Sequence, residues 1–390
     1  MPNRDLDIVL LGATGFTGGL TADYLARHAP DGLRWAIAGR NRDKLEAVRA
    51  RLAAIDPALG DLELVVADAA DRASLDALAA RTTVVATTVG PYLSYGEPLV
   101  AACAAAGTAY VDLTGEPEFV DRMYAAHHAV AERTGARIVH ACGFDSIPHD
   151  LGAYYTVQQL PADEPITMRG VVRAGGMVSG GTFHSALTAM SRPKQMKEAS
   201  AARRRLEQRP AGRSSRAVGA KPRRDPVLGY WLLPLPTIDP VIVARSGAAL
   251  PAYGPRFRYS HFAGTKTLRY AAGGALAVAG LGLAAQVPPL RSFLGSRIEP
   301  GQGPDESRRA SSWFRVDFVG EAGGVQVHTR VSGGDPGYGE TAKMLAESAL
   351  CLALDVNPDV AGQLTPAQAM GDRLLERLEA AGIRFESDPN

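Results

Sequence analysis

Cysteine is scarce in this sequence, and neither sign of charge dominates it. The 390 residues include only Cys103, Cys142 and Cys351, and no two of these form a CxxC pair. Such spacing argues against a disulfide framework and against a zinc site, and it fits a reducing cytoplasm. The formal net charge is +1, so the charge of the whole molecule indicates no nucleic-acid or membrane partner. We therefore expect neither nucleic acid nor metal as a ligand.

The sequence also lacks internal repeats and the features of a signal peptide. Its first seven residues do not show a basic segment followed by an apolar one, which favours a cytoplasmic protein. Its 46% hydrophobic and 21% charged residues are typical of a globular chain with a large core. A length of 390 residues predicts two domains, or one domain with a large insertion. A homodimer is an open option.

A glycine-rich turn follows the first apolar run of the chain. The glycines are spaced G-x-x-G-x-x-G, and a helix-like pattern follows them. The first permits a tight turn, the second lets the backbone approach a pyrophosphate, and the third lets the helix pack closely. The helix N-terminus then offers unpaired N–H groups to an anion. We predict a dinucleotide-binding turn made of Gly12, Ala13, Thr14, Gly15, Phe16, Thr17 and Gly18.

Strand-like and helix-like segments alternate through the first 145 residues. Stretches rich in Ala, Leu, Arg and Glu, such as 44–54 and 117–133, separate the apolar runs. The alternation predicts an α/β fold with a Rossmann-like, doubly wound parallel sheet and a ligand at the carboxyl ends of its strands. The apolar runs are 8–11, 35–38, 62–66, 84–87, 109–113 and 137–140.

The end of the second predicted strand indicates the cofactor. An NAD-binding protein usually has an acidic residue there, which holds the ribose 2′-hydroxyl. This chain has Arg40 followed by Asn41 instead. A guanidinium suits a 2′-phosphate, so we predict NADP(H). Arg42 and Lys44 either contribute to this site or are solvated charges at the start of a helix.

Two more loops contribute to the predicted cofactor site. Asp68, after the third strand, either accepts a hydrogen bond from adenine or caps a helix. The fourth strand leads into Thr88, Gly90 and Pro91, which we expect to pass the nicotinamide. Tyr92 follows and either faces the substrate or packs in the interior.

Several motifs in order resemble one known family. They are Gly-Ala-Thr-Gly-Phe-Thr-Gly, Ala-Gly-Arg-Asn, Val-Gly-Pro-Tyr, Tyr-Val-Asp-Leu-Thr-Gly-Glu and Gly-Phe-Asp-Ser-Ile-Pro, with Ser-Gly-Gly-Thr and Asp-Pro-Gly-Tyr later in the chain. Together they resemble the saccharopine dehydrogenase-like oxidoreductases, and within them the trans-acting enoyl reductases of actinobacterial polyketide lipid synthesis. The resemblance implies NADPH-dependent reduction of a double bond in a polyketide or long-chain acyl thioester. The basic stretch 192–224 could equally dock an acidic acyl carrier domain that presents this substrate, or be a solvated loop.

Such a reduction needs a proton donor as well as a hydride. Tyr92, Ser146, His149 and His184 are the candidates, and each is also open to a purely structural role. Two other functions stay open. One is an imine or carbonyl reductase, as in the amino-acid branch of the family. The other is a membrane-associated protein that binds NADP without turnover.

After residue 150 the alternation of strands and helices ends. A strand at 168–174 precedes a helix over 183–191, and 312–319 and 325–331 form a predicted hairpin. Gly180, Gly181 and Thr182 either hold an anion or a thioester carbonyl, or form only a turn and a cap. We divide the chain into a cofactor domain (1–150), an α+β substrate domain (151–340) with an insertion at 192–295, and helices (341–390). The resemblance implies that these last helices return to the first domain.

The insertion combines a basic and an apolar stretch. Residues 192–224 hold twelve Lys or Arg against two Glu, a local charge of +10, and their Gly, Pro and Ser content predicts mobility. Residues 270–290 carry no charge. They could form a buried core helix, lie in a membrane interface, or line an acyl tunnel. Because charge and apolarity occur together, we favour peripheral contact with an anionic membrane surface, such as the plasma membrane.

Overall fold

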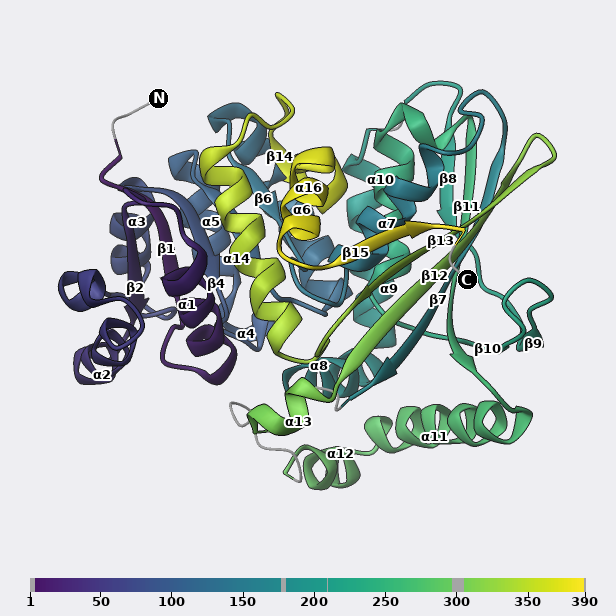
Figure 1. The fold of residues 1–390 in the computed structure, drawn as a ribbon, viewed down its shortest axis with the longest axis horizontal. Coiled ribbons are helices and arrows are strands. Elements are labelled where there is room, and N and C mark those ends of the chain that lie inside the picture. The colour runs from purple at the N-terminus through teal and green to yellow at the C-terminus, as the bar shows by residue number, and fades with distance from the viewer. Residues whose placement is uncertain (1–3, 177–179, 209, 297–304, 389–390) are drawn as a thin grey trace.

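Two β-sheets organise the chain, one in each half of the molecule (Figure 1). The structure is a computed structural model that describes residues 4–176, 180–208, 210–296 and 305–388. The cofactor half lies at the purple end of the colour scale in Figure 1, and the second sheet lies beside it.

The first sheet is entirely parallel, and its order is β14-β6-β5-β4-β1-β2-β3. This order places β1 and β4 side by side at the centre, which is the switch point of a doubly wound fold. The expected Rossmann-like sheet is confirmed, although β14 joins it from the far end of the chain. The strands are β1 (Leu6–Leu11), β2 (Trp35–Gly39), β3 (Glu63–Val66), β4 (Thr82–Thr87), β5 (Ala109–Asp112), β6 (Arg137–Val139) and β14 (Gly362–Leu364).

Helices between these strands cover the sheet, and their buried faces form its core. Asn41 and Asp71 begin two of them, since their side chains accept hydrogen bonds from backbone N–H groups of the first turn. The helices are α1 (Phe16–His28), α2 (Arg42–Ala53), η1 (Pro57–Asp61), α3 (Arg72–Ala80), α4 (Tyr92–Tyr95), α5 (Glu97–Ala106) and α6 (Pro117–Thr134).

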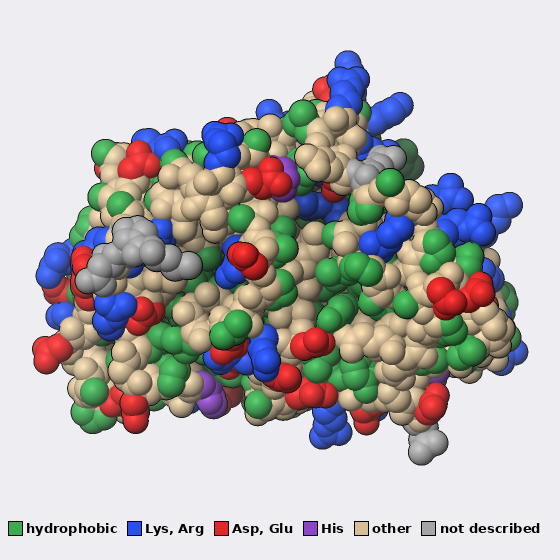
Figure 2. Space-filling model, turned by 90° about the horizontal axis from the view of Figure 1, so that it is seen from above, with side chains coloured by type: hydrophobic (Ala, Val, Ile, Leu, Met, Phe, Trp, Pro, Cys, Tyr) green, Lys and Arg blue, Asp and Glu red, His purple; other side chains and the backbone are tan. Residues whose placement is uncertain are grey.

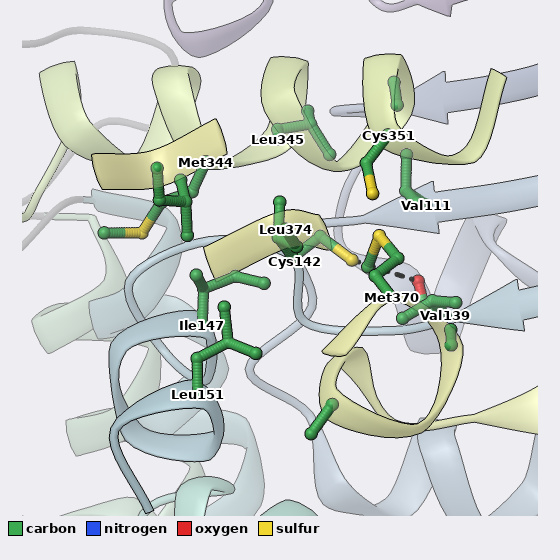
Figure 3. Packing of buried hydrophobic residues seen from close by; sticks show 14 of the residues in the cluster. Val111, Val139, Cys142, Ile147, Leu151, Met344, Leu345, Cys351, Met370 and Leu374 are labelled. Atoms are coloured by element: carbon green, nitrogen blue, oxygen red, sulfur yellow. Dashed lines mark hydrogen bonds between the residues drawn. The ribbon is translucent and has the colours of Figure 1, made fainter. Parts of the chain in front are cut away.

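A helix from the C-terminal part of the chain completes the first domain. Helix α14 (Gly339–Leu354) packs against α1, β4 and β5. Figure 3 shows Leu345 and Cys351 of this helix close to Val111 and Cys142 of the cofactor half. The predicted return of the chain to the first domain is therefore confirmed, and the contact is a continuous apolar core.

The second sheet is mixed, with the order β15-β13-β12-β7-β11-β10-β9 and with β8 beside β11. The predicted hairpin is present as β12 and β13, paired antiparallel around a tight turn. The strands are β7 (Ile166–Gly175), β8 (Ser214–Ala217), β9 (Arg223–Arg224), β10 (Trp231–Pro234), β11 (Arg256–Thr265), β12 (Trp313–Ala322), β13 (Val325–Gly333) and β15 (Arg384–Ser387).

The helices of the second half differ from expectation in two places. Among the helices expected over 341–390, the amphipathic stretch 367–381 does not form one helix but is divided at Gly371, whose φ of 46° interrupts it. The basic stretch is not simply a mobile loop, because it forms α9, β8 and β9, and Arg203 pairs with buried Asp121 at 2.5 Å. The helices are α7 (Ile147–Val157), α8 (Gly180–Ser191), α9 (Pro193–Leu206), α10 (Asp239–Ala249), η2 (Pro251–Tyr253), α13 (Glu306–Ala310), α15 (Pro366–Ala369) and α16 (Gly371–Ala380).

Helices α11 (Leu268–Gln286) and α12 (Pro288–Gly295) form an arm below the second sheet (Figure 1). By length and composition α11 could cross a membrane, yet only 11% of its apolar window is buried. Leu276 and Leu283 are 75% and 73% exposed. Of the three alternatives for this stretch, the buried core helix is therefore wrong.

Candidate functional site

The glycine turn between β1 and α1 has the shape of a phosphate cradle. Gly12 has a φ of +97°, a conformation that side chains disfavour, and its carbonyl accepts a hydrogen bond from Gly15 N at 3.0 Å. A Cβ on Gly18 would lie 2.1 Å from the Gly12 carbonyl oxygen, so only glycine fits. Helix α1 begins at Phe16 without a side-chain cap. Its first N–H groups can therefore bind a cofactor phosphate.

The loop after β4 lies against this turn. Thr88 Oγ1 donates to the Gly12 carbonyl at 3.2 Å, and Thr88 N donates to Leu11 O at 3.0 Å. Gly90 and Pro91 follow in an exposed position, joined by a cis peptide. Two loops predicted to bind the cofactor are thus brought together at the carboxyl ends of adjacent strands.

Residues at the ends of β2 and β3 lie at the adenosine side of such a site. Arg40 is exposed at the end of β2. Asn41 caps α2 by accepting from Lys44 N at 2.9 Å, and Arg42 pairs with Glu46. Asp68 Oδ1 accepts from Ala70 N at 3.0 Å. These contacts support local structure, and the cofactor roles of Arg40, Asn41 and Asp68 stay predictions.

Tyr92 is buried beneath the β4 loop. Its hydroxyl donates to Thr87 O at 3.2 Å and accepts from Leu113 N at 3.1 Å. Burial raises the pKa of Tyr92 well above its usual value. Glu116 accepts from the N–H groups of Tyr92 and Leu93, which holds the start of α4. The observed partners give Tyr92 a structural role, and its role as a proton donor stays a prediction.

Tyr338 joins the cofactor side to the predicted substrate side. Its ring packs edge-on against Phe16 with 4.9 Å between the centroids, and its hydroxyl accepts from Gly180 N at 3.4 Å. The start of α8 with Gly180 and Gly181 therefore lies next to the glycine turn. The side chain of Thr182 is outside the described residues. Tyr338 was not predicted as a site residue. It belongs to the Asp-Pro-Gly-Tyr motif of the family, but no spacing of residues around it indicates a catalytic or binding role.

Arg309 also reaches the glycine turn from a distant part of the chain. Its guanidinium carbon lies 5.7 Å from the centroid of the Phe16 ring. The residue belongs to the short helix α13. It adds positive charge beside a loop shaped for phosphate, and nothing in the sequence around it indicates this proximity.

The loop after β6 brings several polar groups to the same edge of the sheet. Ser146 is buried, its hydroxyl donates to Asp145 O at 2.6 Å, and its carbonyl starts α7. Asp145 is only partly exposed, and burial together with nearby Asp239 raises its pKa to about 7. Buried His149 lies 3.0 Å from Asp239. Sequence reasoning missed Asp145, although it stands beside two residues that were predicted.

Two carboxylates and one histidine lie outside this cluster. Asp112 accepts from Tyr110, Thr114 N and Ala141 N, and Asp150 accepts from Ser246 and Ala367 N, so both have structural roles. His184, on α8, lies beside α12, where a Cβ on Gly295 would be 3.4 Å from its Cε1. It does not lie with Ser146 and His149.

A surface cavity of about 540 Å³ lies elsewhere, among α7, α10, α15 and α16. Its walls include Tyr154, Leu250, Met370 and Arg373. None of the predicted cofactor, catalytic or substrate residues lines it. The converging loops at the carboxyl edge of the first sheet are therefore the better candidate site.

Comparisons with known proteins identify relatives of this chain. The saccharopine dehydrogenase NADP binding domain matches residues 8–139. A Mycobacterium tuberculosis protein provisionally named as a trans-acting enoyl reductase is 42% identical, with 98% of each chain covered. The trans-acting enoyl reductase of Mycobacterium bovis BCG is 39% identical, with 97% of each covered. Apo saccharopine dehydrogenase of Saccharomyces cerevisiae shares the fold, with a TM-score of 0.56, 12% identity, and 98% and 99% coverage.

Proposed function

Since this chain belongs to the NADP-binding oxidoreductases of the trans-acting enoyl reductase family, we propose that it reduces a carbon–carbon double bond of an acyl thioester with NADPH. The substrate is a polyketide or long-chain acyl group presented on a carrier domain. The observation that carries the proposal is the contact of Tyr338 with both Phe16 and Gly180. This contact brings the glycine turn, which is shaped for phosphate, next to the start of α8 in the second domain. The chain also matches these reductases along nearly its full length.

The cofactor supplies a hydride for the β-carbon, and this chain supplies binding, orientation and a proton. The turn from Gly12 to Gly18 holds the pyrophosphate, because its backbone leaves room that a Cβ would fill. The backbone N–H groups that follow Gly180 at the start of α8 are suited to the thioester oxygen, on which charge accumulates. The partly exposed Asp145 is our choice for protonating the α-carbon, because Ser146 and His149 near it are buried.

The direct test is NADPH oxidation by the purified protein, followed by the loss of cofactor absorbance. Enoyl thioesters of short and long chain, free and on a carrier protein, are the substrates, and mass spectrometry of the product should show the addition of two hydrogens. Asp145→Asn should lower turnover and leave NADPH affinity unchanged. Failure of every thioester to be reduced by protein that binds NADPH would contradict the proposal.

The choice of NADPH over NADH rests on Arg40. A charge-assisted hydrogen bond to the 2′-phosphate contributes about 1.5–3 kcal/mol, which corresponds to roughly 10- to 150-fold in affinity. Arg40→Gln should weaken NADPH binding by that factor and leave NADH binding unchanged. Arg42→Gln is the matched control, since Arg42 already pairs with Glu46 at 3.1 Å. Equal effects of the two substitutions would assign the phosphate to another group.

The arm of α11 and α12 supports peripheral contact with an anionic membrane. An acyl tunnel needs enclosing walls, whereas only 11% of the apolar window of α11 is buried. Figure 2, seen from above, shows exposed Lys and Arg side chains on this face at both ends of the molecule, including the end that holds the second sheet. Exposed members of the basic stretch include Arg204, Arg205, Arg216, Lys221 and Arg223. An exposed apolar helix in a chain that also carries exposed basic side chains suits an anionic lipid surface.

Flotation with vesicles tests this contact. The protein should float with phosphatidylglycerol vesicles and much less with phosphatidylcholine vesicles. Leu276→Glu with Leu283→Glu should abolish flotation, because both leucines are exposed on α11. Val356→Glu, at an 89% exposed position outside the arm, is the control. Flotation unchanged by the double substitution would exclude α11 as the contact.

A further inference from the structure

Three buried polar side chains converge where the two sheets meet. His149 comes from the first turn of α7, Asp239 from the first turn of α10, and His261 from β11. Their exposed fractions are 2%, 3% and 5%. One ligand atom from each lies within 4.8 Å of the others. No cysteine takes part, so the scarcity of cysteine in the sequence does not bear on this cluster.

The short contacts within the cluster leave several buried atoms without a partner of good hydrogen-bond geometry. His149 Nδ1 lies 3.0 Å from Asp239 Oδ1, and His261 Nε2 lies 3.6 Å from Asp239 Oδ2. Nevertheless both His149 nitrogens, Asp239 Oδ1 and His261 Nε2 lack a hydrogen-bond partner within the described part of the chain. Each unpaired buried polar group costs about 1–3 kcal/mol. Several such unpaired atoms lie together in this cluster, so their combined cost to the free energy of folding is large. A single bound group that interacts with several of them would remove most of it.

A divalent metal ion meets this requirement. Imidazole nitrogen and carboxylate oxygen are ligands of Zn²⁺, and three protein ligands with an open fourth position form a known type of zinc site. Bonds of about 2.0–2.1 Å in tetrahedral geometry place ligand atoms ~3.3 Å apart. The separations of 3.0 Å to Asp239 Oδ1 and 3.6 Å to Asp239 Oδ2 lie on either side of this value, and one ligand atom from each residue lies within 4.8 Å of the others. A cation would also neutralise Asp239, which forms no ion pair with Lys or Arg of the described residues.

The surroundings hold the imidazoles in place for such an ion. Tyr259 and His261 Nδ1 are 3.0 Å apart, so a hydrogen bond there orients the ring and leaves Nε2 facing Asp239. Metal-bound histidines commonly have a partner of this kind on the second nitrogen. The His149 ring packs edge-on against both Phe144 and His261, with centroids 5.3 and 5.1 Å apart. We propose that His149, Asp239 and His261 bind a divalent transition-metal ion, with Zn²⁺ the best fit.

The test uses the untagged, chelator-treated full-length protein. Titration with Co²⁺ should give saturable visible absorption typical of four or five ligands, and Zn²⁺ should displace the Co²⁺ and raise the melting temperature. Asp239→Asn and His261→Gln should each weaken metal binding at least 100-fold. Tyr259→Phe should weaken it about 10- to 100-fold, since Tyr259 acts only through His261.

His328→Gln is the matched control. His328 Nε2 lies 3.0 Å from Asp317 Oδ1, so the substitution removes another His–Asp pair while leaving the proposed site intact. This variant should bind Co²⁺ as the wild-type protein does. Absence of saturable binding to the wild-type protein would overturn the proposal and identify the cluster as a buried ion pair. Binding lost in His328→Gln would also overturn it. Neither measurement needs a substrate, so both are independent of the proposed reductase activity.

Discussion

Replacing Gly18 by alanine tests the cradle that underlies the cofactor assignment. The new Cβ would lie 2.1 Å from the Gly12 carbonyl oxygen and 2.7 Å from Thr88 Oγ1. The first of these is a backbone atom, so the glycine turn or the start of α1 must move. Alanine favours a helix over glycine by about 1 kcal/mol, whereas forcing atoms into a packed site costs typically ~1–3 kcal/mol or more. We expect a net loss of about 1–2 kcal/mol in the free energy of unfolding, and NADPH affinity lowered at least tenfold.

Gly19→Ala is the matched control, because Gly19 is also in α1 and gains the same helix propensity. Its nearest neighbour would be the Arg51 side chain at 3.3 Å, and the next contact is at 3.8 Å. This variant should keep NADPH affinity and be equally or slightly more stable. Urea unfolding gives the stabilities, and fluorescence titration gives NADPH affinity. If the two variants have equal stability and equal affinity, the turn is not the tight cradle described above.

Two further predictions concern an ion pair and a basic residue of the site. Desolvation alone would raise the pKa of Asp225, but hydrogen bonds from Arg169 and from backbone N–H groups outweigh it and lower this pKa. Asp225 thus stabilises the fold above its unfolded pKa and loses this effect as pH falls. Asp225→Asn should therefore lower the free energy of unfolding at pH 7, measured by urea unfolding, and the difference from the wild-type protein should shrink toward pH 3. Asp76→Asn, at an exposed position, is the control and should change this free energy little at either pH. Arg309→Gln, which removes the charge near Phe16, should weaken NADPH binding about threefold to tenfold by fluorescence titration, with the weakening reduced at high salt; an effect independent of salt would contradict an electrostatic role.

The sequence determined the first domain almost completely. Apolar runs separated by helical patterns are local signals, and six of the seven parallel strands lie where those runs predict them. The glycine turn is equally local, because a positive φ at Gly12 and the close approach at Gly18 depend on residues only a few positions apart. The seventh strand, β14, was not predicted, because three residues without a distinctive pattern join the sheet only by pairing with β6.

The tertiary structure alone decided which distant residues meet. Tyr338 and Arg309 reach Phe16 because α13 and the start of α14 fold back over the first domain. His149 and His261 meet Asp239 because α7 and α10 pack beside β11, and no spacing in the sequence expresses that contact. The apolar composition of residues 270–290 also could not show whether this helix is buried or exposed. Burial depends on which other elements pack against a helix, and α11 is mostly exposed. Local patterns therefore specify the elements and the phosphate turn, and packing between elements specifies the chemistry around them.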